Sequence, residues 1–272
     1  MKYPHVKVLL VVLLVAVGLG CFAGRPYRHH PGRGRGAWRY PSPPAEKPDR
    51  AVLDDGNLVR DEFDGRNGKL LYCRFAENMD REGAPLLVLI LHGRSGSGSD
   101  NAQQLATPAI KPFLEHVRKN RIKAVFLLPQ CQQGSGWVDD DMMKLVMEFF
   151  DAMSRKYGAP PRKCLLTGFS MGGGACYVLA AANPGRFARI WVVGAGGFPE
   201  MAKGMRGDFY ISGGGEDRVV PVANAEKMAA ALRDHGCEVQ LEILPGKGHV
   251  DGGAAAYRGK GRDWFFAPAA AR

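Results

Sequence analysis

Apolar residues in this chain of 272 residues gather into short continuous runs that alternate with amphipathic stretches from about residue 51 onward. Such runs predict strands at residues 86–91, 124–128, 164–167, 190–193, 209–212 and 239–244. The runs lack in–out alternation, which is typical of central parallel strands covered on both faces. Two earlier stretches, 52–60 and 69–75, flank a glycine-containing turn and predict an opening antiparallel pair.

The stretches between these runs predict helices. In residues 142–157 apolar side chains recur at helical spacing, after an acidic first turn and before a stop at Gly158. A second amphipathic helix is predicted over residues 222–235, and Gly236 ends it. Strands and helices therefore alternate, and the expected fold class is α/β, with a mostly parallel central sheet and helices on both faces.

The first 23 residues have the pattern of an export signal. Lys2 and Lys7 precede an apolar run at residues 8–19, which is shorter than the roughly 20 apolar residues of a membrane-spanning helix. Residues 18–21 resemble a lipobox, in which Cys21 becomes lipidated and anchors the protein. Alternatively, a general signal peptidase reads the small residues of 21–23, or the segment stays uncleaved as a tether. We expect an exported protein that is periplasmic, secreted or an envelope lipoprotein.

The net charge of +10 is concentrated before the predicted folded part. Residues 1–60 hold ten basic and four acidic residues, so the remainder is close to balanced, and we expect no nucleic-acid partner. Residues 24–50 are rich in Pro, Gly and Arg and predict a disordered linker, followed by a single folded domain over 51–272. Any membrane anchoring is expected through the N-terminus only.

The six cysteines contain no C-x-x-C pair, which excludes zinc-ribbon and thioredoxin-like interpretations. Cys73 and Cys131 could form a disulfide in an oxidising compartment, and the sequence leaves that open.

Three residues that follow predicted strands have the chemistry of nucleophilic acyl transfer. Ser170 is the centre of a Gly-x-Ser-x-Gly pentapeptide between a strand and a small-residue helix, which is the context of a nucleophile elbow. Asp217 and His249 follow the next-to-last and last predicted strands, in the order serine, acid, histidine. The sequence therefore predicts a Ser170–Asp217–His249 triad. Glu216, adjacent to Asp217, is the alternative acid.

A glycine-rich turn after residues 86–91 predicts the oxyanion hole. Gly93 lets the chain turn so that the Arg94 amide points inward, and the Met171 amide at a helix N-terminus is the second expected donor. His92 is expected to brace this turn and to lie on the substrate side of the site. The turn lacks the Gly-Lys-Ser/Thr ending of a nucleotide-binding loop, which excludes that interpretation.

From about residue 63 to 266 the chain resembles exported bacterial α/β-hydrolase esterases. These are the poly(3-hydroxybutyrate) depolymerase-like, feruloyl esterase-like and "predicted peptidase" proteins, and the phospholipase/carboxylesterase group is also similar. The residues that carry the resemblance are Leu-His-Gly-Arg-Ser-Gly at 91–96, then 99–101, 128–131, 136–139, 168–173, 183–187, 217–221 and 248–249.

The resemblance implies a serine hydrolase of carboxylic esters that needs no cofactor or metal. It also implies that Trp137 lines the acyl or alcohol side of the cleft, although a core position for this tryptophan is the alternative. Many relatives have Asp or Glu and an aromatic residue after the catalytic histidine, whereas here Val250 to Gly253 follow. That departure concerns contacts to the substrate.

The short stretch 194–207, after the strand predicted at 190–193, leaves no room for a lid domain. An open, shallow cleft suits bulky or polymer-borne esters with short acyl or aryl groups, linked to a polysaccharide or polyester. A serine peptidase on the same fold is the alternative function, and a non-catalytic envelope binding protein is a third.

Overall fold

The computed structural model describes residues 47–267, which fall within one compact unit, residues 46–272. The predicted signal segment, Cys21 and most of the predicted linker lie outside these residues. Within the described part, no helix is long and apolar enough to cross a membrane.

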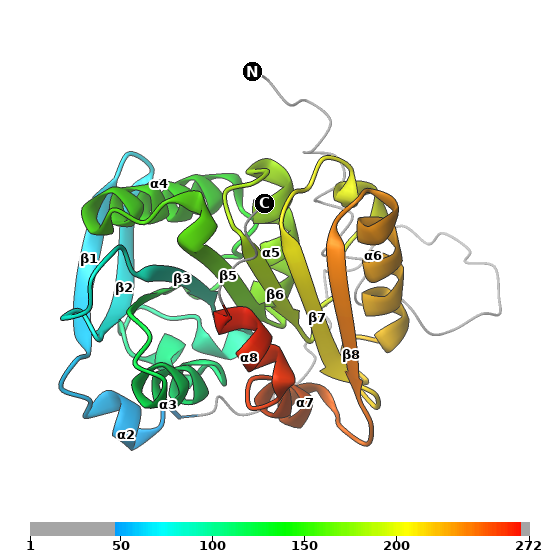
Figure 1. The fold of residues 1–272 in the computed structure, drawn as a ribbon, viewed down its shortest axis with the longest axis horizontal. Helices are drawn as coiled ribbons and strands as arrows, with labels where there is room; N and C mark the ends of the chain where they lie inside the picture. The colour runs from blue at the N-terminus through cyan, green and yellow to red at the C-terminus, as the bar shows by residue number, and fades with distance from the viewer. Residues whose placement is uncertain (1–46, 268–272) are drawn as a thin grey trace, which may run out of the picture. The chain divides into compact units, whose positions relative to one another are not determined.

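The core of the domain is one eight-stranded sheet in the order β1-β2-β4-β3-β5-β6-β7-β8 (Figure 1). The strands are β1 Val59–Gly65, β2 Gly68–Glu77, β3 Leu86–Leu91, β4 Ala124–Pro129, β5 Cys164–Phe169, β6 Arg189–Val193, β7 Asp208–Gly214 and β8 Glu238–Leu244. β1 pairs with β2, and β2 with β4, antiparallel, while all the other pairs are parallel. Every predicted central strand is present, and the six parallel strands end at one edge of the sheet.

Helices cover both faces of the sheet, as the burial of its central strands requires. They are α2 Arg50–Leu53, α3 Ile110–Lys119, α4 Asp140–Tyr157, α5 Met171–Ala182, α6 Val222–Asp234, α7 His249–Ala256 and α8 Lys260–Phe266. Apolar residues of α4, α5 and α6 pack with one face, and those of α3, α7 and α8 pack with the other (Figure 1). The predicted fold class is confirmed: this is an α/β-hydrolase fold, and β6 leads to β7 through residues 194–207, whose only regular structure is one 3-10 turn.

The start of the domain differs from the expected strand at 52–60. Residues Arg50–Leu53 form the short helix α2, capped by the Asp49 carboxylate, which accepts a hydrogen bond from the Ala51 amide at 2.9 Å. The sequence Asp-Asp-Gly-Asn at 54–57 then turns the chain, because these residues favour turns over strands. As a result, β1 begins only at Val59.

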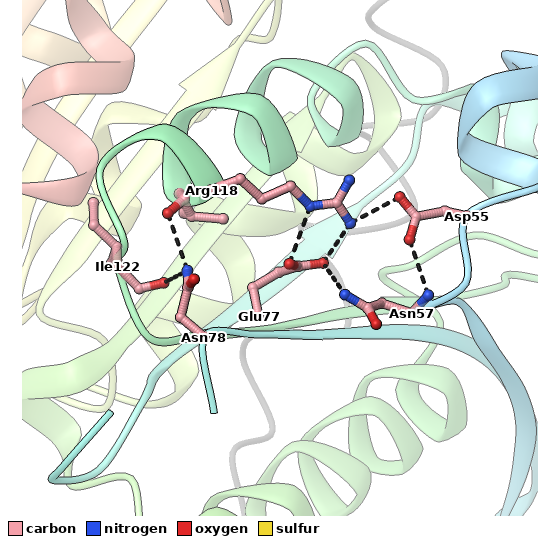
Figure 2. A network of polar contacts seen from close by, with 7 residues as sticks. Asp55, Asn57, Glu77, Asn78, Arg118 and Ile122 are labelled. Atoms are coloured by element: carbon pink, nitrogen blue, oxygen red, sulfur yellow. Dashed lines mark hydrogen bonds and ion pairs between the residues drawn. The ribbon is translucent and has the colours of Figure 1, made fainter. Parts of the chain in front are cut away.

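A polar network holds this turn to the sheet (Figure 2). The Arg118 guanidinium on α3 donates to both carboxylate oxygens of Glu77 on β2, at 3.0 and 2.6 Å, and pairs with Asp55 at 2.8 Å. The side-chain amide of Asn57 donates to the same Glu77 carboxylate at 3.1 Å. The side-chain amide of Asn78 donates to the Ile122 carbonyl at 2.7 Å, so the end of β2 is fixed to the segment after α3.

Cys73, Cys131, Cys164 and Cys176 are buried free thiols. Cys73 packs on the sheet face covered by α3, whereas Cys131 packs on the face covered by α4. The sheet itself separates the two sulfur atoms, so the disulfide that the sequence left open does not form.

Candidate active site

Ser170 lies in a sharp turn between β5 and α5. Its backbone angles are φ 55° and ψ −116°, a region that side-chain-bearing residues seldom occupy. A side chain at Gly168 would collide with the Gly172 backbone, and one at Gly172 would collide with the backbone of Leu91. The pentapeptide glycines are therefore required by the close approach of strand, turn and helix, which holds the hydroxyl at the carboxyl edge of the sheet.

The structure brings the three predicted triad side chains into one hydrogen-bonded chain. Ser170 Oγ lies 2.8 Å from His249 Nε2, and His249 Nδ1 lies 2.7 Å from Asp217 Oδ2. An ionised carboxylate can only accept a hydrogen bond, so Nδ1–H donates to Asp217, and Nε2 can accept the proton of the serine hydroxyl. This arrangement can perform acyl transfer.

Asp217 is held in its ionised form. Burial would raise the pKa of this carboxyl, but hydrogen bonds from His249 and from the Val220 and Val219 amides outweigh burial, and its pKa is lowered. Both amides donate to Oδ1 at 2.8 Å, while His249 bonds to Oδ2, so both carboxylate oxygens are held. Glu216, the alternative acid, is exposed, and His249 bonds to Asp217 instead.

The two amides expected to form the oxyanion hole begin helical segments beside Ser170. Met171 is the first residue of α5, and Arg94 is the first residue of the 3-10 turn Arg94–Gly96. The first amides of a helix have no acceptor within it. A Cβ placed on Gly93 would lie 3.5 Å from the Ser170 Cβ, which shows how closely this turn approaches the serine.

His92 braces the turn after β3, which is expected to form the oxyanion hole. It is 2% exposed; its Nδ1 lies 2.6 Å from the Gly93 carbonyl and its Nε2 lies 3.0 Å from the Cys131 amide. Because the carbonyl accepts and the amide donates, Nδ1 carries the only ring proton and the imidazole is neutral. Burial lowers the pKa of His92 to about 4, in agreement with this tautomer. The bracing role is therefore observed, whereas the expected position beside the substrate is wrong, because the ring is buried.

Trp137 also lies behind the turn and does not line the cleft. It is 2% exposed, its indole N–H donates to the His92 carbonyl at 2.9 Å, and its ring packs on the His92 ring at 4.7 Å between centroids. The implied contact of Trp137 with substrate is thus corrected to the alternative, a core tryptophan. A buried indole needs an acceptor for its N–H, and the His92 carbonyl supplies it.

Two residues that the sequence analysis missed support the site. The Phe169 ring packs on the imidazole of His249, with centroids 5.0 Å apart and planes at 34°. The side chain of buried Gln130 accepts from the Asn101 amide at 2.8 Å and donates to Asp100 at 2.7 Å, which ties β4 to the segment after the oxyanion turn. In the sequence, the only signal for them is that they lie in the segments 168–173 and 128–131, which carry the family resemblance.

The described residues contain no cluster of three or more His, Cys, Asp or Glu side chains that could hold a metal ion. The expectation that no cofactor or metal is needed comes from the family resemblance and stays a prediction.

Comparison with known proteins agrees with this fold. Residues 130–253, which include Ser170, Asp217 and His249, match the family described as the dienelactone hydrolase family. The match spans less than half of the chain and supports hydrolysis of an ester. No curated protein matches.

Among solved structures, a thermostable esterase has a TM-score of 0.70 at 19% identity, and the match covers 77% of this chain and 62% of the esterase. A ferulic acid esterase has a TM-score of 0.60 at 15% identity, with 74% and 95% covered. An S-formylglutathione hydrolase from Agrobacterium tumefaciens has a TM-score of 0.62 at 12% identity, with 78% and 96% covered. At such identities the likeness establishes the α/β-hydrolase fold.

Proposed function

We propose that this protein is a serine hydrolase that cleaves carboxylic esters through an acyl-enzyme, with Ser170 as nucleophile. The observation that carries the proposal is the continuous hydrogen-bonded chain from Ser170 Oγ through His249 to Asp217. The dienelactone hydrolase family match supports the ester as the bond that is cleaved.

Each residue has a defined role in this proposal. His249 Nε2 takes the proton of Ser170 Oγ as the oxygen attacks the ester carbonyl, and Asp217 stabilises the imidazolium that forms. The amides of Arg94 and Met171 stabilise the negative charge on the carbonyl oxygen. His249 then gives its proton to the leaving alkoxide, and a water molecule, activated in the same way, releases the acid and restores Ser170.

We further propose that the substrates are bulky or polymer-borne esters with short acyl or aryl groups, such as those linked to a polysaccharide or polyester. The short β6–β7 connection supports this, because within the described part of the chain no lid domain is inserted between these strands. Strong activation by emulsions of long-chain triglycerides would contradict this substrate class, since such activation requires a lid that opens at an interface.

A fluorophosphonate probe tests the nucleophile. The folded protein should be labelled stoichiometrically at Ser170, and S170A should not be labelled. Absence of labelling in the folded wild-type protein would overturn the enzyme proposal. A panel from p-nitrophenyl acetate to feruloylated sugars, assayed beside peptide substrates, then separates ester from peptide hydrolysis.

Export is a separate proposal that rests on the sequence of the N-terminal segment. The positive start, the apolar run of 8–19 and Cys21 support an exported protein whose only membrane contact is at its N-terminus. Metabolic labelling with a fatty acid, in wild type and C21A, tests lipidation. Equal incorporation into both proteins would exclude Cys21 as the anchor.

A further inference from the structure

The Phe169 side chain connects the strand that carries the nucleophile to the base of the triad. Phe169 is the last residue of β5 and directly precedes Ser170, and it is only 8% exposed. Its ring packs against the His249 imidazole, with centroids 5.0 Å apart and planes inclined at 34°. A displacement of the Phe169 ring therefore acts directly on His249.

Glycines from three separate segments leave the space that the Phe169 ring occupies. A Cβ on Gly253, in the helix α7 that begins at His249, would lie 2.8 Å from the ring carbon Cδ2, closer than real Cβ atoms approach. A Cβ on Gly194, directly after β6, would lie 3.1 Å from Cε2 of the ring and 3.4 Å from His249 Cε1. At the other edge of the ring, a Cβ on Gly93 would lie 3.2 Å from Cδ1. The ring is thus closely packed between segments that are far apart in the chain.

The two hydrogen bonds of His249 hold its imidazole mainly within the ring plane. They join Nδ1 to Asp217 and Nε2 to Ser170, and each nitrogen donates or accepts in that plane. A tilt of the imidazole out of its plane changes these bonds gradually, because hydrogen bonds tolerate a range of angles. A closely packed ring against one face of the imidazole opposes such a tilt directly, since it leaves no free space to move into.

The bond to Ser170 is lost during the proposed reaction. Once an acyl group is attached to Ser170 Oγ, the hydroxyl proton that bonded to Nε2 is gone. His249 must nevertheless hold and deprotonate a water molecule in this state. The imidazole is then positioned by Asp217 and by its packing on Phe169.

We propose that Phe169 is a positioning residue that holds the plane of the His249 imidazole, and that its effect is greatest in the acyl-enzyme. This rests on the proposed function, because it requires an acyl group on Ser170. The step concerned is the release of the acid. His249 Nε2 takes a proton from water as the water oxygen attacks the acyl carbonyl, and it returns that proton to Ser170 Oγ as the bond between Oγ and the acyl carbon breaks.

The variant F169L tests the proposal, because leucine stays apolar but lacks the flat ring. Acid-quench mass spectrometry during turnover of p-nitrophenyl acetate gives the acetylated fraction of the protein, and kcat divided by this fraction is the rate constant of deacylation. The ratio kcat/KM reports acylation. In F169L the deacylation constant should fall by roughly tenfold and kcat/KM by less than about threefold, because a misplacement of about 1 Å costs on the order of 100-fold and leucine keeps part of the packing.

F126L is the matched control for the loss of a buried ring. Phe126 is fully buried on the same face of the sheet, and its ring contacts Phe113 and Phe266. All rates are expressed per site that a fluorophosphonate labels, so a fraction of unfolded protein does not alter them. On this basis F126L should keep the wild-type values of both constants.

G253A disturbs the same contact from the helix that carries His249. Its added methyl has to displace the Phe169 ring, whereas alanine by itself favours a helix more than glycine does. The deacylation constant should again fall more than kcat/KM. G253A decides the question if F169L does not fold.

A wild-type deacylation constant in F169L would overturn the inference. Equal decreases of deacylation and acylation would also overturn it, as would an F126L variant that loses as much as F169L, because each is the signature of a generally distorted site. Failure of the proposed function has a different signature: the wild-type protein is not labelled at Ser170, and no acetylated protein forms.

Discussion

Ser170 adopts a left-handed φ of 55° in the turn between β5 and α5, where hydrogen bonds on both sides hold its backbone. Its amide donates to the Val193 carbonyl at 2.9 Å and its carbonyl accepts from the Gly174 amide at 3.0 Å, so the turn is fixed to both β6 and α5. Strained backbone angles of this kind persist only where the surrounding structure holds them in place. The position of the Ser170 hydroxyl therefore depends on individual hydrogen bonds.

The acid of the triad can be tested by a substitution that keeps its shape. D217N should lower kcat by about 10⁴-fold, because the amide cannot stabilise the imidazolium and favours the wrong tautomer of His249. E216Q, at the exposed neighbouring carboxylate, should retain nearly wild-type kcat. Steady-state kinetics on p-nitrophenyl acetate measure both, and the reverse order of effects would make Glu216 the acid.

Neutral His92 should make the protein sensitive to acid. Its pKa is about 4 in the folded protein, against an ordinary value of 6.5. Below pH 6.5 the unfolded chain takes up a proton that folded His92 refuses, so stability is full above that pH and falls as the pH decreases toward 4. The loss reaches about 3 kcal/mol.

Urea unfolding of wild type and H92Q at pH 7.5 and 4.5 measures this loss. The wild-type free energy of unfolding should fall by about 2–3 kcal/mol more than that of H92Q. An identical decrease in both proteins would show that His92 does not titrate in this way.

Among the elements, the junction of α2, β2 and α3 depends on charge. The Glu77 side chain is only 5% exposed, and Arg118 supplies its countercharge while also binding Asp55 (Figure 2). These bonds raise the pKa of Arg118 further: the hydrogen bond to Glu77 dominates, partly opposed by burial. A buried carboxylate left without its partner is costly, so this junction is a sensitive point of the fold.

R118M should therefore destabilise the protein by about 3 kcal/mol, because it leaves the carboxylate of Glu77 buried without a cation. R121M is the matched control: Arg121 pairs with Asp80 at 3.0 Å, but both side chains are more than 60% exposed. Removing that pair should cost less than about 1 kcal/mol. Chemical denaturation measures both, and equal effects would contradict a special role for Glu77.

In the whole molecule, the sheet determines which side chains come into contact. Its parallel strands end at one edge, so loops far apart in the chain deliver Ser170, Asp217 and His249 to one place. The same sheet keeps the thiols apart, because Cys73 and Cys131 pack on opposite faces.

The four buried thiols, Cys73, Cys131, Cys164 and Cys176, should accordingly be unreactive in the folded domain. Burial raises the pKa of Cys73 to about 12 and that of Cys131 to about 11, and of the five described cysteines only Cys237 is partly exposed. In the C21A protein, a thiol reagent should modify at most Cys237 until denaturant is added, and then all five. Reducing agent should leave the melting temperature unchanged, whereas a decrease would reveal a disulfide.

The sequence by itself determined the fold class and the order of nucleophile, acid and base. Continuous apolar runs identify strands buried on both faces, and Ser170, Asp217 and His249 each follow such a run, which is a local pattern. It predicted a strand where α2 lies, because apolar Val52 and Leu53 outweighed the turn residues that follow. It also expected Trp137 and His92 beside the substrate.

Only the tertiary structure decided which side chains near Ser170 are exposed and which are buried beneath the turn. Burial and hydrogen-bond partners depend on packing between segments distant in the chain, such as the Trp137 indole on the His92 carbonyl 45 residues earlier. The exposure of Val219 and Val250 is likewise invisible in the sequence, where two valines look like core. Local pattern fixed the elements, and the packing of those elements fixed which side chains are buried and which are exposed around the nucleophile.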